Sequence, residues 1–367
     1  MKVKLGDITS KIGSGATPRG GKNNYEKIGV AFIRSQNVRD FYFDYNQLAF
    51  INDNQASQLS NVKVKLNDIL LNITGDSITR CTLSPKDILP ARVSQHVAII
   101  RCHKNINSKF IMYNLQYMKN YLLSICKIGG TRNALTKEML ANLTIDLPPK
   151  EMQDKIAALL GALDDKIALN KKINATLEAM AKTLYMHEFF RKPPNSKLGD
   201  VIIENPKSTI PVGAAKLSVG EFPFFTSGDS VLNWTDSLVD GRNIFLNTGG
   251  NAGIKFHVGK AAYSTDTWCI AAENLTDYLY LLLKVVEPEL DKKFFQGTGL
   301  KHLQKPLLKE RAIYIPTETE REQFNSIVRP CFTKISANVR ESRRLAELRD
   351  WLLPMLMNGQ IDFKEKI

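Results

Sequence analysis

The feature that most constrains the fold of this chain is an internal repeat. When the sequence is shifted against itself by 168 residues, Gly129–Pro148 aligns with Gly297–Pro316, and the same register continues for roughly sixty residues. The opening stretch Lys4–Ile8 also recurs, as Lys197–Val201, at an offset of 193. The second copy therefore lacks about 25 residues of the first. We infer a duplication in which each half is a globular domain followed by a helix.

Both globular parts are predicted to be mixed α/β. Short β-rich runs such as Val30–Ile33, His96–Arg101 and Ala312–Ile315 alternate with loops rich in Gly, Asn, Ser and Thr. A helical stretch at Ser108–Cys126 has a counterpart at Leu275–Val286. The order of the strands does not follow from the sequence.

The boundaries of the parts follow from prolines and helical runs. A stretch almost free of proline and glycine begins at Glu151, and Pro193-Pro194 end it. We therefore expect four parts in chain order: a first domain (1–148), a first helix (149–192), a second domain (193–316), and a second helix with a tail (317–367).

The helical segment of each copy carries a heptad pattern. Apolar residues recur at alternating steps of four and three, and charged residues fill most other positions. This narrow apolar seam favours a coiled coil over the alternative of two amphipathic helices that each pack on their own domain. Pro330 should kink or break the second helix near its start. The seam residues are Ile156, Leu160, Leu163, Ile167, Asn170, Leu177 and Leu184, then Phe324, Val328, Ile335, Asn338, Leu345 and Leu352.

The charge balance favours a polyanionic partner. The 367 residues carry a formal net charge of +13, with a sequence pI of about 9.4, which suits nucleic acid; a basic protein without such a partner is the alternative. Hydrophobic residues make up 43% and charged residues 24% of the chain, as in ordinary soluble proteins. We see no leader peptide and no membrane-spanning run. The five widely spaced cysteines indicate a reducing cytoplasm.

The motifs of nucleotide-, methyl-donor- and metal-dependent enzymes are missing from the sequence. Gly15–Asn23 looks like a phosphate-binding loop, but its glycine spacing is wrong by one residue, and Pro18 removes a backbone donor. Asn205-Pro206-Lys207 lacks the second proline of an adenine methyltransferase loop. The five histidines contain no i, i+4 pair for a metal. The sequence therefore predicts no catalytic residue and no metal site.

Polar loop residues instead offer side chains that are suited to contact DNA. Arg can bond guanine through two hydrogen bonds, Asn or Gln can do the same for adenine, and Lys suits phosphates. Any single cluster is more often a solvated loop, but their recurrence in both halves of a basic chain favours the set. The Gly249–Gly253 turn is expected to expose Asn247, Thr248 and Asn251. The candidates are Arg19, Lys22, Arg34, Ser35, Gln36, Asn37, Arg80, Arg92, Gln95, His96, Arg132 and Asn133 in the first half, and Thr226, Ser227, Asn247, Thr248, Asn251, Lys255, Lys301 and His302 in the second.

With these features the chain resembles the DNA specificity subunits of type I restriction–modification systems. The resemblance rests on Gly15–Gly21 with Phe32–Val38 in the first half, and on Phe222–Ser227 with Thr248–Ala252 in the second. It extends to a proline-ended strand before each helix and to the closing Leu348–Ile361, and it covers essentially the whole chain. The rather short overall length departs from the family's pattern.

The resemblance implies an α+β fold with two target-recognition domains and a long antiparallel two-helix coiled coil, related by a pseudo-two-fold axis. Each domain would recognise one half of a bipartite site in double-stranded DNA. The paired helices would set the spacing and dock methyltransferase (modification) subunits, with restriction subunits in the larger complex. S-adenosylmethionine, ATP and Mg²⁺ would be bound by those partners, and this chain would be non-catalytic. In such an antiparallel pair the midpoints of the two seams, Asn170 and Asn338, should face each other.

Two alternatives stay open. One is a stand-alone enzyme that both recognises and modifies DNA, which would need a methyl-donor motif that we do not find. The other is a coiled-coil DNA-binding scaffold without sequence preference, for which different loops in the two halves would serve no purpose.

Overall fold

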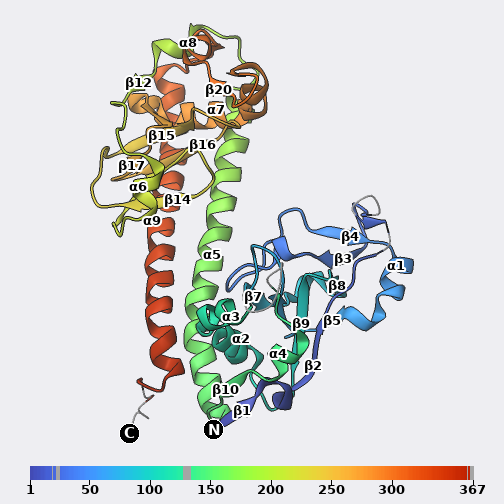
Figure 1. The fold of residues 1–367 in the computed structure, drawn as a ribbon. Coiled ribbons are helices and arrows are strands. Elements are labelled where there is room, and N and C mark those ends of the chain that lie inside the picture. Colours follow the sequence, from blue (N-terminus) through green and yellow to red (C-terminus); the bar gives the residue numbers. More distant parts are fainter. Residues whose placement is uncertain (19, 22–24, 127–133, 362, 364–367) are drawn as a thin grey trace. The chain divides into compact units, whose positions relative to one another are not determined.

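The chain folds into two compact units, each built around one globular domain. The computed structural model describes residues 1–18, 20–21, 25–126, 134–361 and 363. Unit 1 comprises 1–167 and 343–367, and unit 2 comprises 168–342. Two long helices, α5 (Lys150–Glu188) and α9 (Glu318–Met357), each contribute to both units (Figure 1). The unit boundary therefore falls within the long helices.

The first domain contains two four-stranded sheets. In one, the order β2-β9-β6-β7 is antiparallel throughout. In the other, the order is β4-β3-β8-β5, and the central pair β3 and β8 is parallel. The strands are β2 (Thr9–Ser14), β3 (Val30–Ile33), β4 (Ala49–Ile51), β5 (Lys63–Val64), β6 (Ile69–Asn72), β7 (Cys81–Leu83), β8 (Ala91–Val93) and β9 (Val97–Cys102).

The second domain repeats this topology, except that its second sheet has three described strands and no counterpart of β5. Its antiparallel sheet has the order β12-β18-β15-β16, and its second sheet has the order β14-β13-β17 with a parallel pair, β13 and β17. The strands are β12 (Ile203–Glu204), β13 (Phe222–Phe225), β14 (Val231–Trp234), β15 (Arg242–Asn247), β16 (Ile254–Val258), β17 (Ala262–Tyr263) and β18 (Thr267–Ala271). The match of strand order and direction confirms the duplication predicted from the sequence.

The remaining elements also come in corresponding pairs. A short antiparallel ladder joins the start of each domain to the strand before its long helix: β1 (Lys2–Lys4) pairs with β10 (Thr144–Asp146), and β11 (Ser196–Lys197) with β21 (Ala312–Ile313). The predicted helical stretches are α2 (Ser108–Tyr117) with α3 (Lys119–Ile125), and α7 (Thr276–Lys293). The others are α1 (Asp53–Gln58), α4 (Lys137–Ala141), α6 (Val212–Lys216), α8 (Lys305–Lys309), β19 (Phe295–Gln296) and β20 (His302–Leu303).

The repeated opening motif has a structural explanation. Leu5 and Leu198 are both fully buried, and each backbone N–H bonds to the carbonyl of the residue directly before β10 or β21. A Cβ placed on Gly6 or Gly199 would lie 3.1 Å from atoms of α4 or α8, respectively. Because only glycine tolerates so close an approach at little cost, the Leu-Gly pair recurs where each domain closes on itself.

The long helices run antiparallel within unit 2, as predicted. Asn170 Nδ2 donates to Ser342 Oγ at 3.2 Å, and Asn338 Nδ2 donates to Asn174 Oδ1 at 2.8 Å. The direct pairing of Asn170 with Asn338 was therefore a wrong prediction. Side chains lean toward the N-terminus of their own helix, so in an antiparallel pair the two asparagines pass each other. Each one meets the residue one turn beyond its expected partner. The two bonds are nevertheless equivalent under the repeat, as a pseudo-two-fold axis requires.

The predicted seam residues are all buried or half-buried. Leu160 and Val328 are fully buried, and Asn170 and Asn338 are 0% and 1% exposed. The break predicted at Pro330 does not occur, because α9 continues through it as one helix. Pro330 is the thirteenth residue of α9, so it removes one interior backbone hydrogen bond, and packing against the domain can hold the helix together around it.

Candidate nucleic-acid interface

The first domain carries a surface hollow of about 870 Å³ at the ends of its central strands. Ser35 and Gln36 enter it from the turn after β3, Arg80 from the segment before β7, and His96 from the turn between β8 and β9. Three of the clusters predicted from the sequence therefore lie together. The other lining residues are Arg39, Thr74, Gly75, Asp76, Ser77, Ile78 and Leu123.

A buried asparagine that we did not predict holds this hollow in shape. Asn72, at the end of β6, is 0% exposed, and its Nδ2 donates to Ser35 O at 2.9 Å and to Ser77 Oγ at 3.1 Å. It thus ties the turn after β3 to the loop after β6. The apolar run around Asn72 gives no loop signal, so only the internal alignment of its strand with β15, which ends in Asn247, could have found it.

Two residues predicted to contact DNA are instead part of the protein interior. Asn37 is 0% exposed, and its amide donates to Asp44 O at 2.9 Å and to Asn46 O at 3.2 Å. Arg92 is 8% exposed, and its Nε donates to Ala56 O at 2.9 Å. Burial lowers the pKa of Arg92. Both predictions are corrected: these side chains fix the backbone, because their polar groups are used within the fold.

Other first-domain candidates remain accessible. Arg34 is half-buried: its guanidinium donates to Gln47 O and lies 5.4 Å from the ring centroid of Tyr25. Gln95 and His96 are exposed, and His96 Nδ1 lies 2.6 Å from Thr74 Oγ1. The candidates Arg19, Lys22, Arg132 and Asn133 lie outside the described residues.

The second-domain candidates also meet at one place, around the backbone of Asp266. Thr248 Oγ1 donates to Asp266 O at 2.7 Å, and Ser227 Oγ donates to the same oxygen. Lys301 and His302 lie beside the glycine turn, because Gly250 N–H donates to Lys301 O at 2.9 Å. Asn251, Lys301 and His302 are exposed.

Three other second-domain candidates are mainly structural. Asn247 is 6% exposed, so the prediction that the glycine turn exposes it was wrong. Its Oδ1 accepts from Lys255 Nζ at 3.0 Å, and the same ammonium donates to Thr226 O at 2.8 Å. Burial lowers the pKa of Lys255. Thr226 is 3% exposed, and its hydroxyl donates to Ser230 O. These three side chains hold the turn after β13 to the end of β15, as Asn72 does in the first domain.

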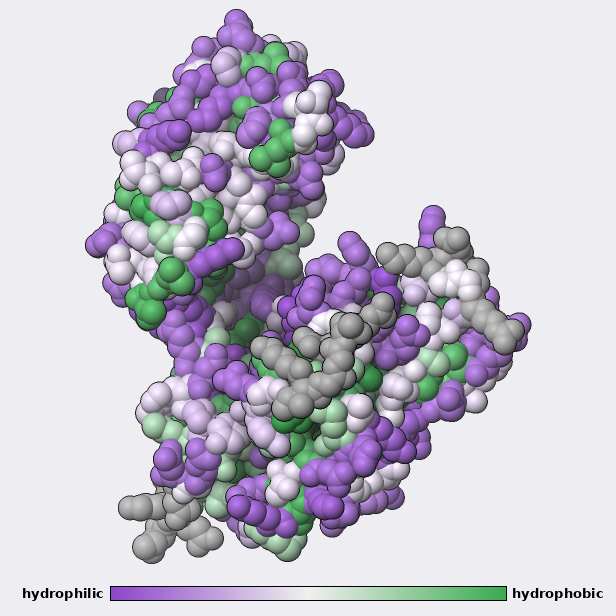
Figure 2. All heavy atoms as spheres, in the orientation of Figure 1, coloured by the Kyte–Doolittle hydropathy of each residue, from purple (hydrophilic) through white to green (hydrophobic). Residues whose placement is uncertain are grey.

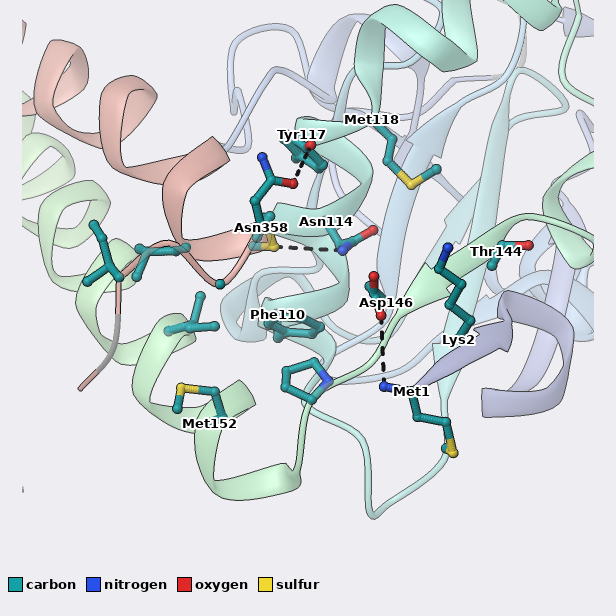
Figure 3. Close-up of a pocket in the computed structure, with 16 residues that line it drawn as sticks. Met1, Lys2, Phe110, Asn114, Tyr117, Met118, Thr144, Asp146, Met152 and Asn358 are labelled. Carbon is teal, nitrogen blue, oxygen red and sulfur yellow. Dashed lines mark hydrogen bonds and ion pairs between the residues drawn. The ribbon is translucent and has the colours of Figure 1, made fainter. Parts of the chain in front are cut away.

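A second hollow in unit 1, of about 790 Å³, lies away from these loops. Figure 3 shows its lining side chains, which come from α2, β1, β10 and the ends of α5 and α9. Met152 and Met357 face it, and the amino group of Met1 lies 3.8 Å from Asp146 Oδ1. Asn114 also lines it, and its Oδ1 is buried without a hydrogen-bond partner.

The corresponding place in unit 2 is filled by aromatic rings. Phe189, which aligns with Met357, is 4% exposed, with its ring centroid 5.3 Å from that of Tyr278 and 5.1 Å from that of Phe324. The aligned side chains in unit 1 have no aromatic ring, except for Phe110, which aligns with Tyr278. The hollow therefore results from side-chain size within one repeated frame.

Figure 2 shows mostly hydrophilic residues on the visible face of each unit. Over the described ranges, no group of three or more His, Cys, Asp or Glu could hold a metal ion. Within that same part of the chain, no helix is long and apolar enough to cross a membrane. All five cysteines are free thiols.

Comparisons with known proteins agree with this arrangement. The family model described as "Type I restriction modification DNA specificity domain" matches residues 1–179 and again 194–340. The type I restriction enzyme MjaIX specificity subunit of Methanocaldococcus jannaschii is 23% identical over 300 residues, covering 70% of this chain and 69% of that protein. The HindI specificity subunit of Haemophilus influenzae is 29% identical over 194 residues, covering 51% of this chain and 40% of that protein. Several matched relatives are covered over about half of their length or less.

A solved structure shares the fold. The S subunit of a type I restriction–modification system from M. genitalium superposes with a TM-score of 0.60, covering 99% of this chain and 96% of that one, at 15% sequence identity. The two family matches fall on the two copies of the repeat and together span most of the chain. The chain therefore belongs to the type I restriction–modification DNA specificity family.

Proposed function

We propose that this chain is the DNA-binding specificity subunit of a type I restriction–modification complex, with each domain recognising one half of a bipartite site. The observation that carries the proposal is the convergence of polar loop residues at the same strand ends in both domains. In the first domain these residues line a hollow with Arg39, Arg80 and His96, whose side chains suit base edges and phosphates.

The partners and cofactors follow from the same proposal. Methyltransferase subunits dock on the paired helices, and restriction subunits join the larger complex. S-adenosylmethionine, ATP and Mg²⁺ belong to those subunits, and this chain works beside DNA in the cytoplasm without catalysing a reaction itself. Support comes from the failed sequence search for a methyl-donor motif and from the family match.

An exchange of domains tests independent recognition. Replacing residues 1–148 with the first domain of another family member should change one half of the methylated site and leave the other half intact. A change in both halves, or in neither, would contradict the proposal. The rival, a stand-alone modifying enzyme, predicts methyl transfer from labelled S-adenosylmethionine by the purified chain alone, which we expect not to occur.

Single substitutions distinguish base contacts from phosphate contacts. Gln36→Ala or Arg80→Ala should cost about 1–3 kcal/mol of binding and relax one position of the first half-site. Substituting a residue that contacts only phosphate should weaken binding to all sequences and flatten the salt dependence. Lys86→Ala, on a turn that does not line the hollow, is a matched control of the same domain.

A further inference from the structure

We propose that Arg349, on the long helix α9, is a positioning residue for the first half-site, because it fixes the loop that borders the first-domain hollow. This inference rests on the proposed function and names a residue that acts through others rather than on DNA. Arg349 belongs to unit 1, so every contact in the argument lies within one compact unit.

Arg349 is a buried cation held from two sides. It is 9% exposed, and its Nη1 donates to Asp164 Oδ1 on α5 at 2.7 Å. Asp164 also accepts from the hydroxyl of Tyr113 on α2. Because a buried ion pair gains little net stability over apolar packing, its presence calls for a reason other than stability.

The guanidinium of Arg349 also covers an aromatic ring from a loop. Its central carbon lies 3.7 Å from the ring centroid of Phe41. Phe41 has φ +69°, a left-handed conformation that is unfavourable for a bulky residue and persists only where its surroundings hold it. The cation–π contact and the bond from Phe41 N–H to Cys81 O at 3.1 Å are two such constraints.

The loop that contains Phe41 leads directly to the hollow. It connects β3 to β4 through residues 34–48, and it includes Gln36 and Arg39, which line the hollow. Arg39 is held by Asp44 at 3.3 Å, and Asp44 N–H donates to Asn37 O at 2.8 Å. A shift at Phe41 would therefore move the backbone that carries Arg39, two residues away.

The second copy of the repeat supplies an internal comparison. The corresponding connection, between β13 and β14, is the short stretch 226–230, with no equivalent of the Phe41 turn. The residue that aligns with Arg349 under the 168-residue repeat is Ala181, which is buried and apolar. The long loop and the arginine therefore occur together in one copy and are both missing from the other. This correlation points to a role in holding the loop rather than in pairing the helices.

The test measures each half-site separately. Full-length wild type and variants are incubated with random duplex DNA, bound duplexes are recovered and sequenced, and enrichment is scored for the two half-sites. Arg349→Met should lower the preference at one or more first-half positions by roughly tenfold, about the size of one lost base contact, with the second half unchanged. Arg349→Lys, which keeps the charge, should lose less.

Two further variants separate positioning from simple destabilisation. Phe41→Leu keeps apolar bulk but loses the ring face, and should reproduce the half-site effect. Tyr113→Phe removes a hydrogen bond to Asp164 but keeps the ring, whose centroid lies 6.1 Å from that of Phe41, and should lower Tm with both half-sites unchanged. An unchanged first half-site in both Arg349→Met and Phe41→Leu, or an equal loss in both halves, would overturn the proposal. Failure of the wild type to enrich any two-part site would instead refute the proposed function itself, and this inference with it.

Discussion

The loop ends of the two domains share a backbone frame but differ in their side chains. In each domain, the strand after the turn and the central strand are joined by the same main-chain bonds. Ser94 N–H bonds to Ile33 O in the first domain, and Ser264 N–H bonds to Phe225 O in the second. Ile73 N–H bonds to His96 O, and Thr248 N–H correspondingly bonds to Asp266 O. Leu135 N–H bonds to Ile73 O, and Leu303 N–H correspondingly bonds to Thr248 O. These bonds join main-chain atoms only, so the exposed side chains at the loop tips can differ between the domains without breaking them.

The side chains on that frame do vary. Asp266 in the second domain stands at the position of His96. Gly253 stands at the position of Arg80, because Asn72 N–H bonds to Arg80 O and the equivalent Asn247 N–H bonds to Gly253 O. An imidazole ring is thus replaced by a carboxylate, and a guanidinium by a glycine that has no side chain. Side chains that donate hydrogen bonds suit guanine, whereas a carboxylate accepts from the amino group of cytosine. Under the proposed function, two domains that recognise unlike half-sites should differ in this way.

The largest expected difference between the copies concerns the aromatic cluster of unit 2 and the hollow of unit 1. Phe189→Ala should cost about 3–5 kcal/mol of unfolding free energy, because it removes a buried ring from tight packing. The aligned Met357→Ala should cost only about 1–2 kcal/mol, since Met357 already borders open space. Urea unfolding of both variants checks this. Equal losses would mean that the two junctions are equally well packed.

The next largest effect is a pH dependence confined to the second domain. His257 on β16 is 3% exposed, and burial, with a smaller contribution from Arg340, lowers its pKa from 6.5 to about 4. Between pH values of about 4 and 6.5, His257 binds a proton only in the unfolded chain. The free energy of unfolding therefore falls by about 3 kcal/mol as the pH drops from about 6.5 to about 4. His257→Gln should remove this part of the pH dependence of urea unfolding. The first domain has Ser84 at the aligned place, which cannot titrate in this range.

A smaller effect is expected at the buried asparagines that shape the two recognition ends. Asn72→Leu leaves Ser35 O without its donor and should cost about 2–3 kcal/mol, together with discrimination in the first half-site. Asn247→Leu should cost somewhat less, about 1–2 kcal/mol, because Lys255 Nζ still bonds to Thr226 O. Its effect should fall on the second half-site. Loss of discrimination in both halves from either variant would contradict a separate frame for each domain.

The features of this molecule that could be predicted from the sequence are those in which residues recur at a regular spacing. The repeat, the helical seams and the apolar strands follow from spacing, and all three agree with the structure. Whether a loop side chain points outward or inward follows no regular spacing. Asn37 and Arg92 were therefore predicted at the surface, although both are buried in the fold. Asn72 was missed for the converse reason, since it looks like part of an apolar strand. The asparagine pairing failed because register alone ignores the tilt of side chains along a helix.

The smallest effect concerns the two equivalent asparagines of the long helices, both of which lie in unit 2. Asn170 donates to Glu341 Oε2 at 2.9 Å and to Ser342 Oγ at 3.2 Å, and Asn338 donates to Asn174 Oδ1 at 2.8 Å. The Oδ1 of each asparagine, however, is buried without a partner. Leucine at both positions should therefore stabilise the chain by about 1 kcal/mol, since it removes two unsatisfied acceptors and adds apolar contact, while Asn174 and Ser342 stay partly open to water. A buried polar pair fixes register, so the double variant should also tolerate DNA sites of more than one spacer length. Urea unfolding measures the first effect, and selection from duplexes with spacers of different lengths measures the second. A loss of stability, or an unchanged spacer preference with raised stability, would show that the asparagines do not act as the register device of the coil.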